Sequence, residues 1–115
     1  MDIYQGFVDL KPGVTDTDFA DAFAAYMTHL KEHRLIESWR LLRSKLGLGG
    51  GLGEFQFLIE VKGLAQLDEA FLDVSRRAEP VEGKHFAVNS LVANARFALY
   101  RDFPDPQRKR GEERF

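Results

Sequence analysis

The sequence contains no cysteine, so disulfides, thiolate metal ligands and cysteine nucleophiles are excluded. It also contains no apolar run near the roughly 20 residues that a membrane-spanning helix requires, and no basic start followed by an apolar stretch that would predict a signal peptide. An excess of one charge is missing too, because 16 basic residues face 18 acidic ones and leave a formal net charge of -2. A chain with this balance generates no field that attracts nucleic acid. We therefore expect a cytoplasmic protein with neither a nucleic-acid nor a membrane partner.

What the chain does have is the composition of a folded domain, since 44% of its 115 residues are hydrophobic and 30% are charged. A chain of this length buries roughly 60 to 70% of its unfolded surface in one domain. The segment 104–115 differs, because it is mostly charged, contains two prolines and shows no apolar period. We predict a single domain over residues 1–103, followed by a mobile charged tail over residues 104–115.

Five glycines lie within residues 47–53, and two kinds of structure use such a cluster. A phosphate-binding loop of the GxGxxG type starting at Gly47 would need glycine where Leu52 stands, and the GxxxxGK[ST] motif is absent. Such loops also lead from a strand into a helix, whereas residues 54–62 alternate between apolar and polar side chains as a strand does. The cluster therefore predicts a mobile hairpin loop that joins strands at 36–46 and 54–62.

The other segments follow either the strand period or the helix period. Residues 3–10 and 93–103 alternate as strands do. A helix should begin at Thr15 or Asp16, either of which can cap it. Five apolar residues form one stripe along this helix: Phe19, Phe23, Tyr26, Met27 and Leu30. A second amphipathic helix is predicted from residue 64 to about residue 78, with Pro80 as its stop, and residues 85–92 are compatible with a short additional helix.

This order of elements, strand-helix-strand twice with a hairpin between, predicts an α+β domain with the ferredoxin-like split βαβ fold: a four-stranded antiparallel sheet with two helices on one face. Alternation in the third strand sends Phe55 and Phe57 under the helices. The opposite, open face combines apolar and polar side chains, namely Phe7, Leu58 and Tyr100 with Gln5, Gln56 and Arg96. Such a face is too apolar for full exposure. We expect two copies to close these faces on each other, which gives a homodimeric α/β-barrel.

Four segments carry a resemblance to known proteins: residues 10–13, which end the first strand, and residues 35–40, 85–92 and 99–104. With them the chain resembles an uncharacterised family of small bacterial proteins. That family is similar to the dimeric α/β-barrel superfamily, which includes stress-responsive barrel proteins and antibiotic-biosynthesis monooxygenases. The resemblance covers nearly the whole chain and implies the barrel fold and a homodimer, but no activity. Several stress-responsive barrels have a histidine where Gln5 stands here, and glutamine is neither an acid nor a base near neutral pH, which puts chemistry based on that histidine in doubt.

His29 and His33 are four residues apart, a spacing that can present two metal ligands on one helix face. A closed metal site needs three or four ligands, and no HExxH motif or third ligand accompanies the pair. We expect interfacial or solvated histidines and no metal. The sequence also has no motif for a flavin or nicotinamide cofactor and no GxSxG nucleophile elbow, so no cofactor is predicted.

His85 is the histidine best placed for chemistry, because it lies in the linker before the last strand, which can cover the barrel mouth, with Asn89 four residues later. Histidine titrates near neutral pH and moves protons. Arg96 on the next strand can hold a carboxylate or an enolate, and Tyr100 can donate a hydrogen bond. A structural alternative explains the same residues: His85 and Asn89 brace the linker, and Arg96 pairs with Glu60 across the sheet. Both interpretations stay open at this point.

The sequence thus predicts a homodimeric α/β-barrel that binds a small aromatic or carboxylate-bearing molecule in a pocket on the sheet face. Its predicted ligand-binding residues are Gln5, Phe7, Trp39, Gln56, Leu58 and Asn89. The alternative is a cofactor-independent monooxygenase or isomerase with His85, Tyr100 and Arg96 as catalytic residues. A third possibility is a structural or interaction dimer whose barrel is filled by side chains.

Overall fold

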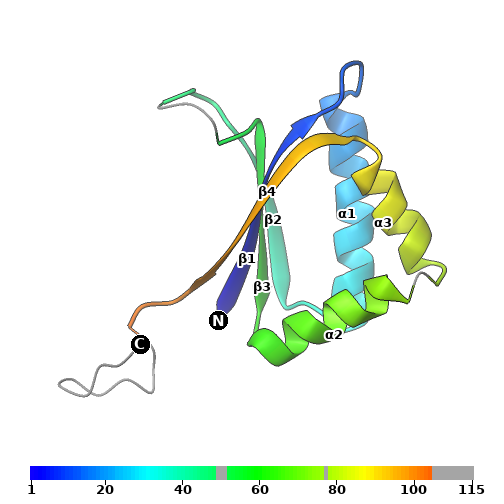
Figure 1. Cartoon of the computed structure of the whole chain (residues 1–115), viewed down its shortest axis with the longest axis vertical. Coiled ribbons are helices and arrows are strands. Elements are labelled where there is room, and N and C mark those ends of the chain that lie inside the picture. Colours follow the sequence, from blue (N-terminus) through cyan, green and yellow to red (C-terminus); the bar gives the residue numbers. More distant parts are fainter. Residues whose placement is uncertain (49–51, 77, 105–115) are drawn as a thin grey trace.

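The computed structural model describes residues 1–48, 52–76 and 78–104. In chain order its elements are β1 (Asp2–Leu10), α1 (Asp16–Glu32), β2 (Ser38–Arg43), β3 (Phe55–Val61), α2 (Leu64–Ser75), α3 (Val81–Asn89) and β4 (Val92–Arg101). The four strands form one antiparallel sheet in the order β2-β3-β1-β4, and the three helices all lie on the same side of it (Figure 1). This arrangement confirms the predicted α+β fold of the split βαβ type, with α3 as an additional helix. Within the described part of the chain, no helix combines the length and the hydropathy needed to span a bilayer.

The core is built on β3, whose side chains alternate between the two faces of the sheet. Its residues buried beneath the helices are Phe55, Phe57, Ile59 and Val61. The buried residues of α1 that join them in the core are Phe19, Phe23, Met27 and Leu30. Each buried side chain of this size contributes roughly 1.5 to 3 kcal/mol relative to exposure. Both the alternation of β3 and the stripe of α1 are visible in the sequence, and both are confirmed.

An ion pair holds β1 against β4 at one end of the sheet. Asp2, which is 3% exposed, lies directly opposite Arg101. Arg101 donates hydrogen bonds from Nε and Nη2 to the two carboxylate oxygens at 2.6 and 2.9 Å. These bonds lower the pKa of Asp2 below its usual value, although burial acts in the opposite direction. The bidentate geometry fixes the end of β4 to the start of β1.

The first turn of α1 is fixed by side chains. Thr15 Oγ1 accepts a hydrogen bond from the backbone N–H of Asp18 at 3.2 Å, so Thr15 is the N-cap. Asp16, the other candidate, instead accepts a hydrogen bond from Arg43 of β2 at 2.6 Å. Arg43 donates a second one to Glu54 at 2.9 Å. This network ties the start of α1 to the hairpin of β2 and β3.

The last turn of α1 ends in a Schellman motif. The N–H of Arg34 donates to the carbonyl of Lys31 at 3.0 Å, and the N–H of Leu35 donates to the carbonyl of Leu30 at 2.9 Å. Arg34 occupies the left-handed position of this motif with a φ of 58°. Glycine is the usual residue there because it has no Cβ to clash with the backbone.

The glycine-rich segment joins β2 to β3, which pair antiparallel from Ser38 opposite Glu60 to Arg43 opposite Phe55. The predicted hairpin is therefore confirmed, with strands shorter than expected. The mobility expected of the loop and of the tail concerns residues 49–51 and 105–115, which lie outside the described residues.

The predicted end of the second helix was wrong. α2 ends at Ser75 instead of continuing to residue 78, and Pro80, expected as its stop, is the N-cap of α3. Proline suits this place because the first N–H groups of a helix have no partner within it, so a missing N–H costs nothing there. The short helix expected at 85–92 accordingly starts earlier, at Val81, and ends at Asn89.

We expect Arg34→Gly to stabilise the protein, because a left-handed backbone costs a residue with a Cβ about 1 kcal/mol that glycine avoids. The side chain of Arg34 is exposed, so little packing is lost. Urea unfolding should give a free energy of unfolding higher by about 1 kcal/mol. The control Ala25→Gly, at an exposed position inside α1, should lower it by about the same amount. Equal or lower stability of Arg34→Gly would contradict this account of the helix end.

Candidate functional site

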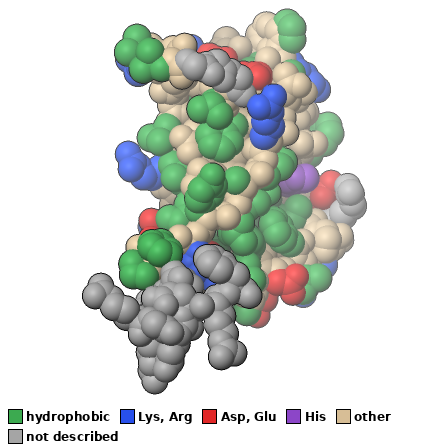
Figure 2. Space-filling model, turned by 60° about the vertical axis from the view of Figure 1, so that its left-hand side comes forward, with side chains coloured by type: hydrophobic (Ala, Val, Ile, Leu, Met, Phe, Trp, Pro, Cys, Tyr) green, Lys and Arg blue, Asp and Glu red, His purple; other side chains and the backbone are tan. Residues whose placement is uncertain are grey.

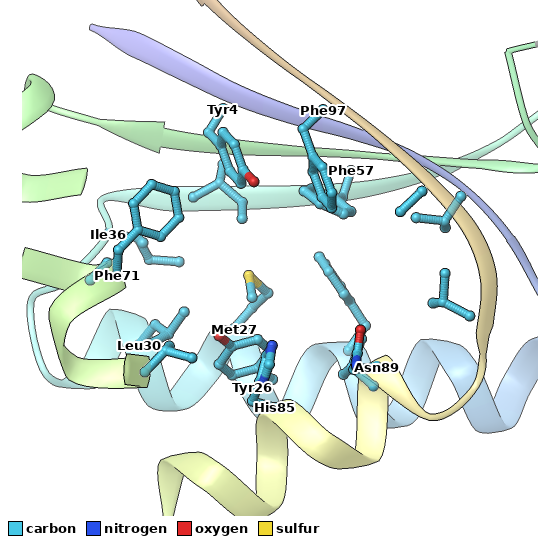
Figure 3. Close-up of a pocket in the computed structure, with 18 of the residues that line it drawn as sticks. Tyr4, Tyr26, Met27, Leu30, Ile36, Phe57, Phe71, His85, Asn89 and Phe97 are labelled. Carbon is cyan, nitrogen blue, oxygen red and sulfur yellow. The ribbon is translucent and has the colours of Figure 1, made fainter. Parts of the chain in front are cut away.

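A cavity of about 310 Å³ lies between the helix-covered face of the sheet and the helices (Figure 3). From the sheet, Tyr4, Phe57 and Phe97 form its roof. From the helices, the labelled residues that border it are Tyr26, Met27 and Leu30 on α1, Phe71 on α2, and His85 and Asn89 on α3. Most of the lining is apolar, and all three helices contribute to it.

The roof is an aromatic cluster that depends on a glycine. Tyr4 stacks on Phe97 with ring centroids 5.7 Å apart and planes inclined by 3°, and it meets Phe71 edge-on at 5.5 Å. Gly6 lies opposite both Phe57 and Phe97 in the neighbouring strands. A Cβ at Gly6 would come within 2.1 Å of the Phe57 ring. Any larger residue at this position would therefore push that ring out of the roof.

Several polar groups of the cavity lie on α3 and on the part of α1 that faces it, while Tyr4 adds a hydroxyl from the sheet. Glu82, His85 and Asn89 line the cavity and are three and four residues apart, so they share one face of α3. The ring of His85 meets Tyr26 of α1 edge-on, with centroids 5.7 Å apart. Figure 3 shows His85 and Asn89 on the side of the cavity opposite the sheet. A bound molecule would meet aromatic rings and the Tyr4 hydroxyl above, and the other hydrogen-bonding groups below.

Burial keeps the phenol groups of the cavity protonated. It is the main cause that raises the pKa of Tyr26 to about 12, followed by the negative charge of Asp73 and smaller effects of Tyr4 and Glu82. Burial also raises the pKa of Tyr4. Since a free tyrosine already titrates near pH 10, both hydroxyls are neutral at physiological pH and can donate hydrogen bonds.

The cavity is most open on the side of α2 and β4. Of its lining residues, Phe71 of α2 is 48% exposed and Phe97 of β4 is 58% exposed, whereas those of α1 are buried or half-buried. Leu99 lies on the same face of β4 as Phe97 and is 47% exposed. Large apolar side chains that stay exposed together mark an interaction site, and here they form the rim of an entrance.

The whole chain, residues 1–115, matches the model of DUF6614, which is described as a family of unknown function. The chain belongs to this family. No curated protein matches it.

Solved structures share the fold of this DUF6614 member but little of its sequence. At3g17210 from Arabidopsis thaliana has a TM-score of 0.73 at 7% identity, over 89% of this chain and 95% of that one. A mutant of SnoaB, a cofactor-independent oxygenase from Streptomyces nogalater, has a TM-score of 0.65 at 10% identity, over 93% and 96%. A dimeric ferredoxin-like protein of unknown function from Jannaschia sp. has a TM-score of 0.64 at 10% identity, over 88% and 98%. The predicted resemblance to ferredoxin-like dimeric barrel proteins is therefore confirmed for the fold.

The predicted ligand-binding and catalytic residues of the DUF6614 member fall on both faces of the sheet. Those on the open face are Gln5, Phe7, Gln56, Leu58, Arg96 and Tyr100, each next to a residue that faces the helices. There, Gln56 Nε2 donates a hydrogen bond to Gln5 Oε1 at 3.0 Å. The remaining residues, Trp39, His85 and Asn89, lie on the helix side, where His85 and Asn89 line the cavity. Trp39 packs edge-on against Phe23, with ring centroids 5.7 Å apart.

Within one protomer, the three predicted catalytic residues do not come together. His85 faces the cavity, while Arg96 and Tyr100 lie on the opposite face of β4. The register also places Arg96 opposite Phe7 and away from Glu60, so the cross-sheet ion pair considered as an alternative does not form. Of the three, His85 alone lines the cavity, where its ring contacts Tyr26.

Sequence reasoning missed Tyr4 and Tyr26 as site residues. Each lies on the apolar face of its element, where periodicity alone does not distinguish a core residue from a cavity wall. A signal was nevertheless present, because tyrosine in an apolar stripe brings a hydroxyl that needs a partner once it is buried. Phenylalanine would have filled the same positions without that requirement.

The rings of His29 and His33 lie side by side at the end of α1, with centroids 4.1 Å apart and planes tilted by 34°. Burial, followed by the nearby His33 and Lys84, lowers the pKa of His29, which is 8% exposed. His33 Nδ1 lies 2.8 Å from the carbonyl oxygen of His29, within hydrogen-bonding distance. Among the described residues, no group of three or more potential metal ligands is found around this pair or elsewhere.

Proposed function

We propose that this DUF6614 member binds a small aromatic molecule in the cavity between its sheet and its helices. The observation that carries the proposal is the cavity itself, which measures about 310 Å³ and combines apolar and aromatic walls with a few polar groups. Ligand sites typically have this composition and a volume of roughly 300 to 1,000 Å³. Protein interiors otherwise pack as densely as organic crystals, so a space of this size lowers stability unless a molecule fills it.

This location differs from the pocket expected from the sequence. His85 and Asn89 belong to the cavity, whereas Gln5, Gln56 and Leu58 lie on the other face of the sheet. The open face therefore does not contribute to this cavity.

We infer that the open face binds a second copy of the chain. Figure 2 shows this face obliquely, with hydrophobic side chains gathered along its middle. Gln5 and Gln56 hydrogen-bond to each other there, which reduces the cost of removing them from water. The Jannaschia protein of the same fold is described as dimeric. A two-fold dimer joins the same face of both copies, so its interface would include Phe7 and Leu58 and leave each cavity on the outside.

A second candidate function is a cofactor-independent isomerase or monooxygenase, and the position of His85 favours it. Its ring lies against Tyr26 at the cavity, and histidine can take a proton from a bound molecule because it titrates near neutral pH. Arg96 and Tyr100 of the same protomer face away. This candidate therefore assigns proton transfer to His85, with Tyr26 as a neighbouring hydrogen-bond donor.

The dimer is tested by Leu58→Asp. We expect the wild type to be dimeric at micromolar concentration in size-exclusion chromatography with light scattering, and Leu58→Asp to be monomeric, because an unpaired carboxylate buried in the interface is strongly unfavourable. The control Leu72→Asp replaces a leucine that is 50% exposed on α2 and should remain dimeric. A monomeric wild type would rule out the dimer while leaving the cavity proposal intact.

Ligand binding is tested by filling the cavity. Ala70 is 5% exposed and lines the cavity, so Ala70→Leu should occupy part of the space and weaken the binding of 2-naphthol at least about tenfold in isothermal titration calorimetry. Ala65→Leu, at an exposed position of the same helix, is the matched control and should bind as the wild type does.

In the wild type, 2-naphthol at 100 times its Kd should stabilise the fold by about 2.7 kcal/mol. Circular dichroism checks that both leucine variants are folded. Unchanged binding by a folded Ala70→Leu variant would place the ligand elsewhere. A wild type that binds neither 2-naphthol nor other bicyclic aromatics would refute the proposal.

Proton transfer is tested with 2-tetralone, a bicyclic ketone whose protons next to the carbonyl exchange in deuterated water. If His85 acts as a base, the wild type accelerates this exchange, and His85→Ala slows it about 100-fold or more, as expected for the loss of a general base. His33→Ala, at an exposed histidine of the α1 end, is the control and should keep the wild-type rate. Exchange that is equally fast in His85→Ala would remove the enzymatic role of His85.

A further inference from the structure

The lining of the cavity is almost free of charge. Among the described residues that form it, Glu82 is the only one with a formal charge at neutral pH, and neither lysine nor arginine is present. The hydrogen-bonding groups are the hydroxyls of Tyr4 and Tyr26, the side chains of His85 and Asn89, and Ser75. Such a wall complements polar but uncharged groups.

We propose that the cavity selects an uncharged aromatic molecule whose ketone, quinone or phenol oxygen accepts a hydrogen bond from Tyr26 or Tyr4, and that it rejects aromatic carboxylates. This inference rests on the proposed binding function and narrows it, because the sequence alone left aromatic and carboxylate-bearing ligands as equal possibilities.

The two tyrosines supply donors from opposite sides of the cavity. Tyr4 projects from the sheet and Tyr26 lies on α1, as Figure 3 shows. Stacking on Phe97 holds the ring of Tyr4 in one orientation, and the edge-on contact with His85 does the same for Tyr26. Their raised pKa values keep both hydroxyls protonated. A neutral oxygen between these walls would therefore find donors whose positions are already fixed.

The lysines and arginines that the structure describes all lie outside the cavity lining. Arg96, the residue expected to hold an anion, is on the opposite face of the sheet. Arg101 is bound to Asp2 at the sheet end, and Arg43 is bound to acidic residues at the start of α1. Lys84 of α3 is not among the lining residues, and its positive charge helps to lower the pKa of His29.

Among the described residues that line the cavity, none offers a counter-ion to a carboxylate that loses its hydration there. Burying an unpaired ion is far more costly than burying a neutral polar group that keeps one hydrogen bond. The physical difference between the two ligand classes is therefore charge, at nearly equal shape.

The decisive experiment compares 2-acetonaphthone with 2-naphthoate, which share the bicyclic ring and differ mainly in the charge of the substituent. Isothermal titration calorimetry with the wild-type chain at neutral pH should show the ketone binding at least tenfold more tightly. Equal or tighter binding of 2-naphthoate would overturn the inference while supporting the proposed binding function. If neither compound nor naphthalene binds, the proposed function itself fails.

The donor role is tested by Tyr26→Phe. Loss of one hydrogen bond should weaken the binding of 2-acetonaphthone about threefold to tenfold. The binding of naphthalene, which accepts no hydrogen bond, should stay unchanged. If the variant weakens both compounds equally, Tyr26 contributes shape only and its assignment as a donor is overturned.

The role of charge is tested without relying on Tyr26. Ala95 of β4 lines the cavity, so Ala95→Lys would add a cation to its wall. This variant should bind 2-naphthoate at least tenfold more tightly than the wild type does. Ala93→Lys is the matched control, because it adds the same charge at an exposed residue outside the lining, and it should leave 2-naphthoate binding weak. An Ala95→Lys variant that still rejects 2-naphthoate would show that charge is not what excludes it.

Discussion

The register of β1 between β3 and β4 is the constraint on which the rest of the structure depends. Because side chains alternate along a strand, a slip of one residue would exchange the two faces of the sheet. The observed register puts Gly6 opposite Phe57 and Phe97, and the Phe57 ring occupies the room that the glycine leaves. The bidentate pair of Asp2 and Arg101 holds the same register at the strand end. The register of β1 therefore determines both which residues form the roof of the cavity and which lie on the open face.

Local patterns made the fold predictable, and tertiary packing decided what they missed. The alternation of β3 and the stripe of α1 are properties of a few consecutive residues, so the sequence shows them directly. Whether Pro80 ends one helix or begins the next depends on the packing of α3 against α1, which no local period encodes. Proline is compatible with both places, so its presence could not decide between them.

The candidate site was harder to predict for a related reason. Parity within a strand correctly separates Gln5 and Leu58 from the core face, but it does not tell which face the linker with His85 will cover. Placing that linker at the barrel mouth grouped His85 with Arg96, although the two lie on opposite sides of the sheet. The sequence did not predict Tyr26 as a cavity residue, because a cavity depends on how helices and strands pack together. The residues that line a cavity have the same periodicity as those of a filled core.

The tyrosines connect the packing of this cavity to the selectivity that we propose for it. Phenylalanine at position 4 or 26 would fill nearly the same space, and a buried hydroxyl without a partner costs about 1 to 3 kcal/mol. Rigid rings stacked as Tyr4 and Phe97 are cannot collapse into the space beneath them, which keeps the cavity open. The same rigidity fixes the direction of the hydroxyl before a ligand arrives, so less conformational entropy is lost on binding. A neutral acceptor oxygen would accept a hydrogen bond from that hydroxyl and would need no counter-ion, which the described lining lacks. The contacts that stabilise the cavity walls would then also determine the proposed ligand selectivity.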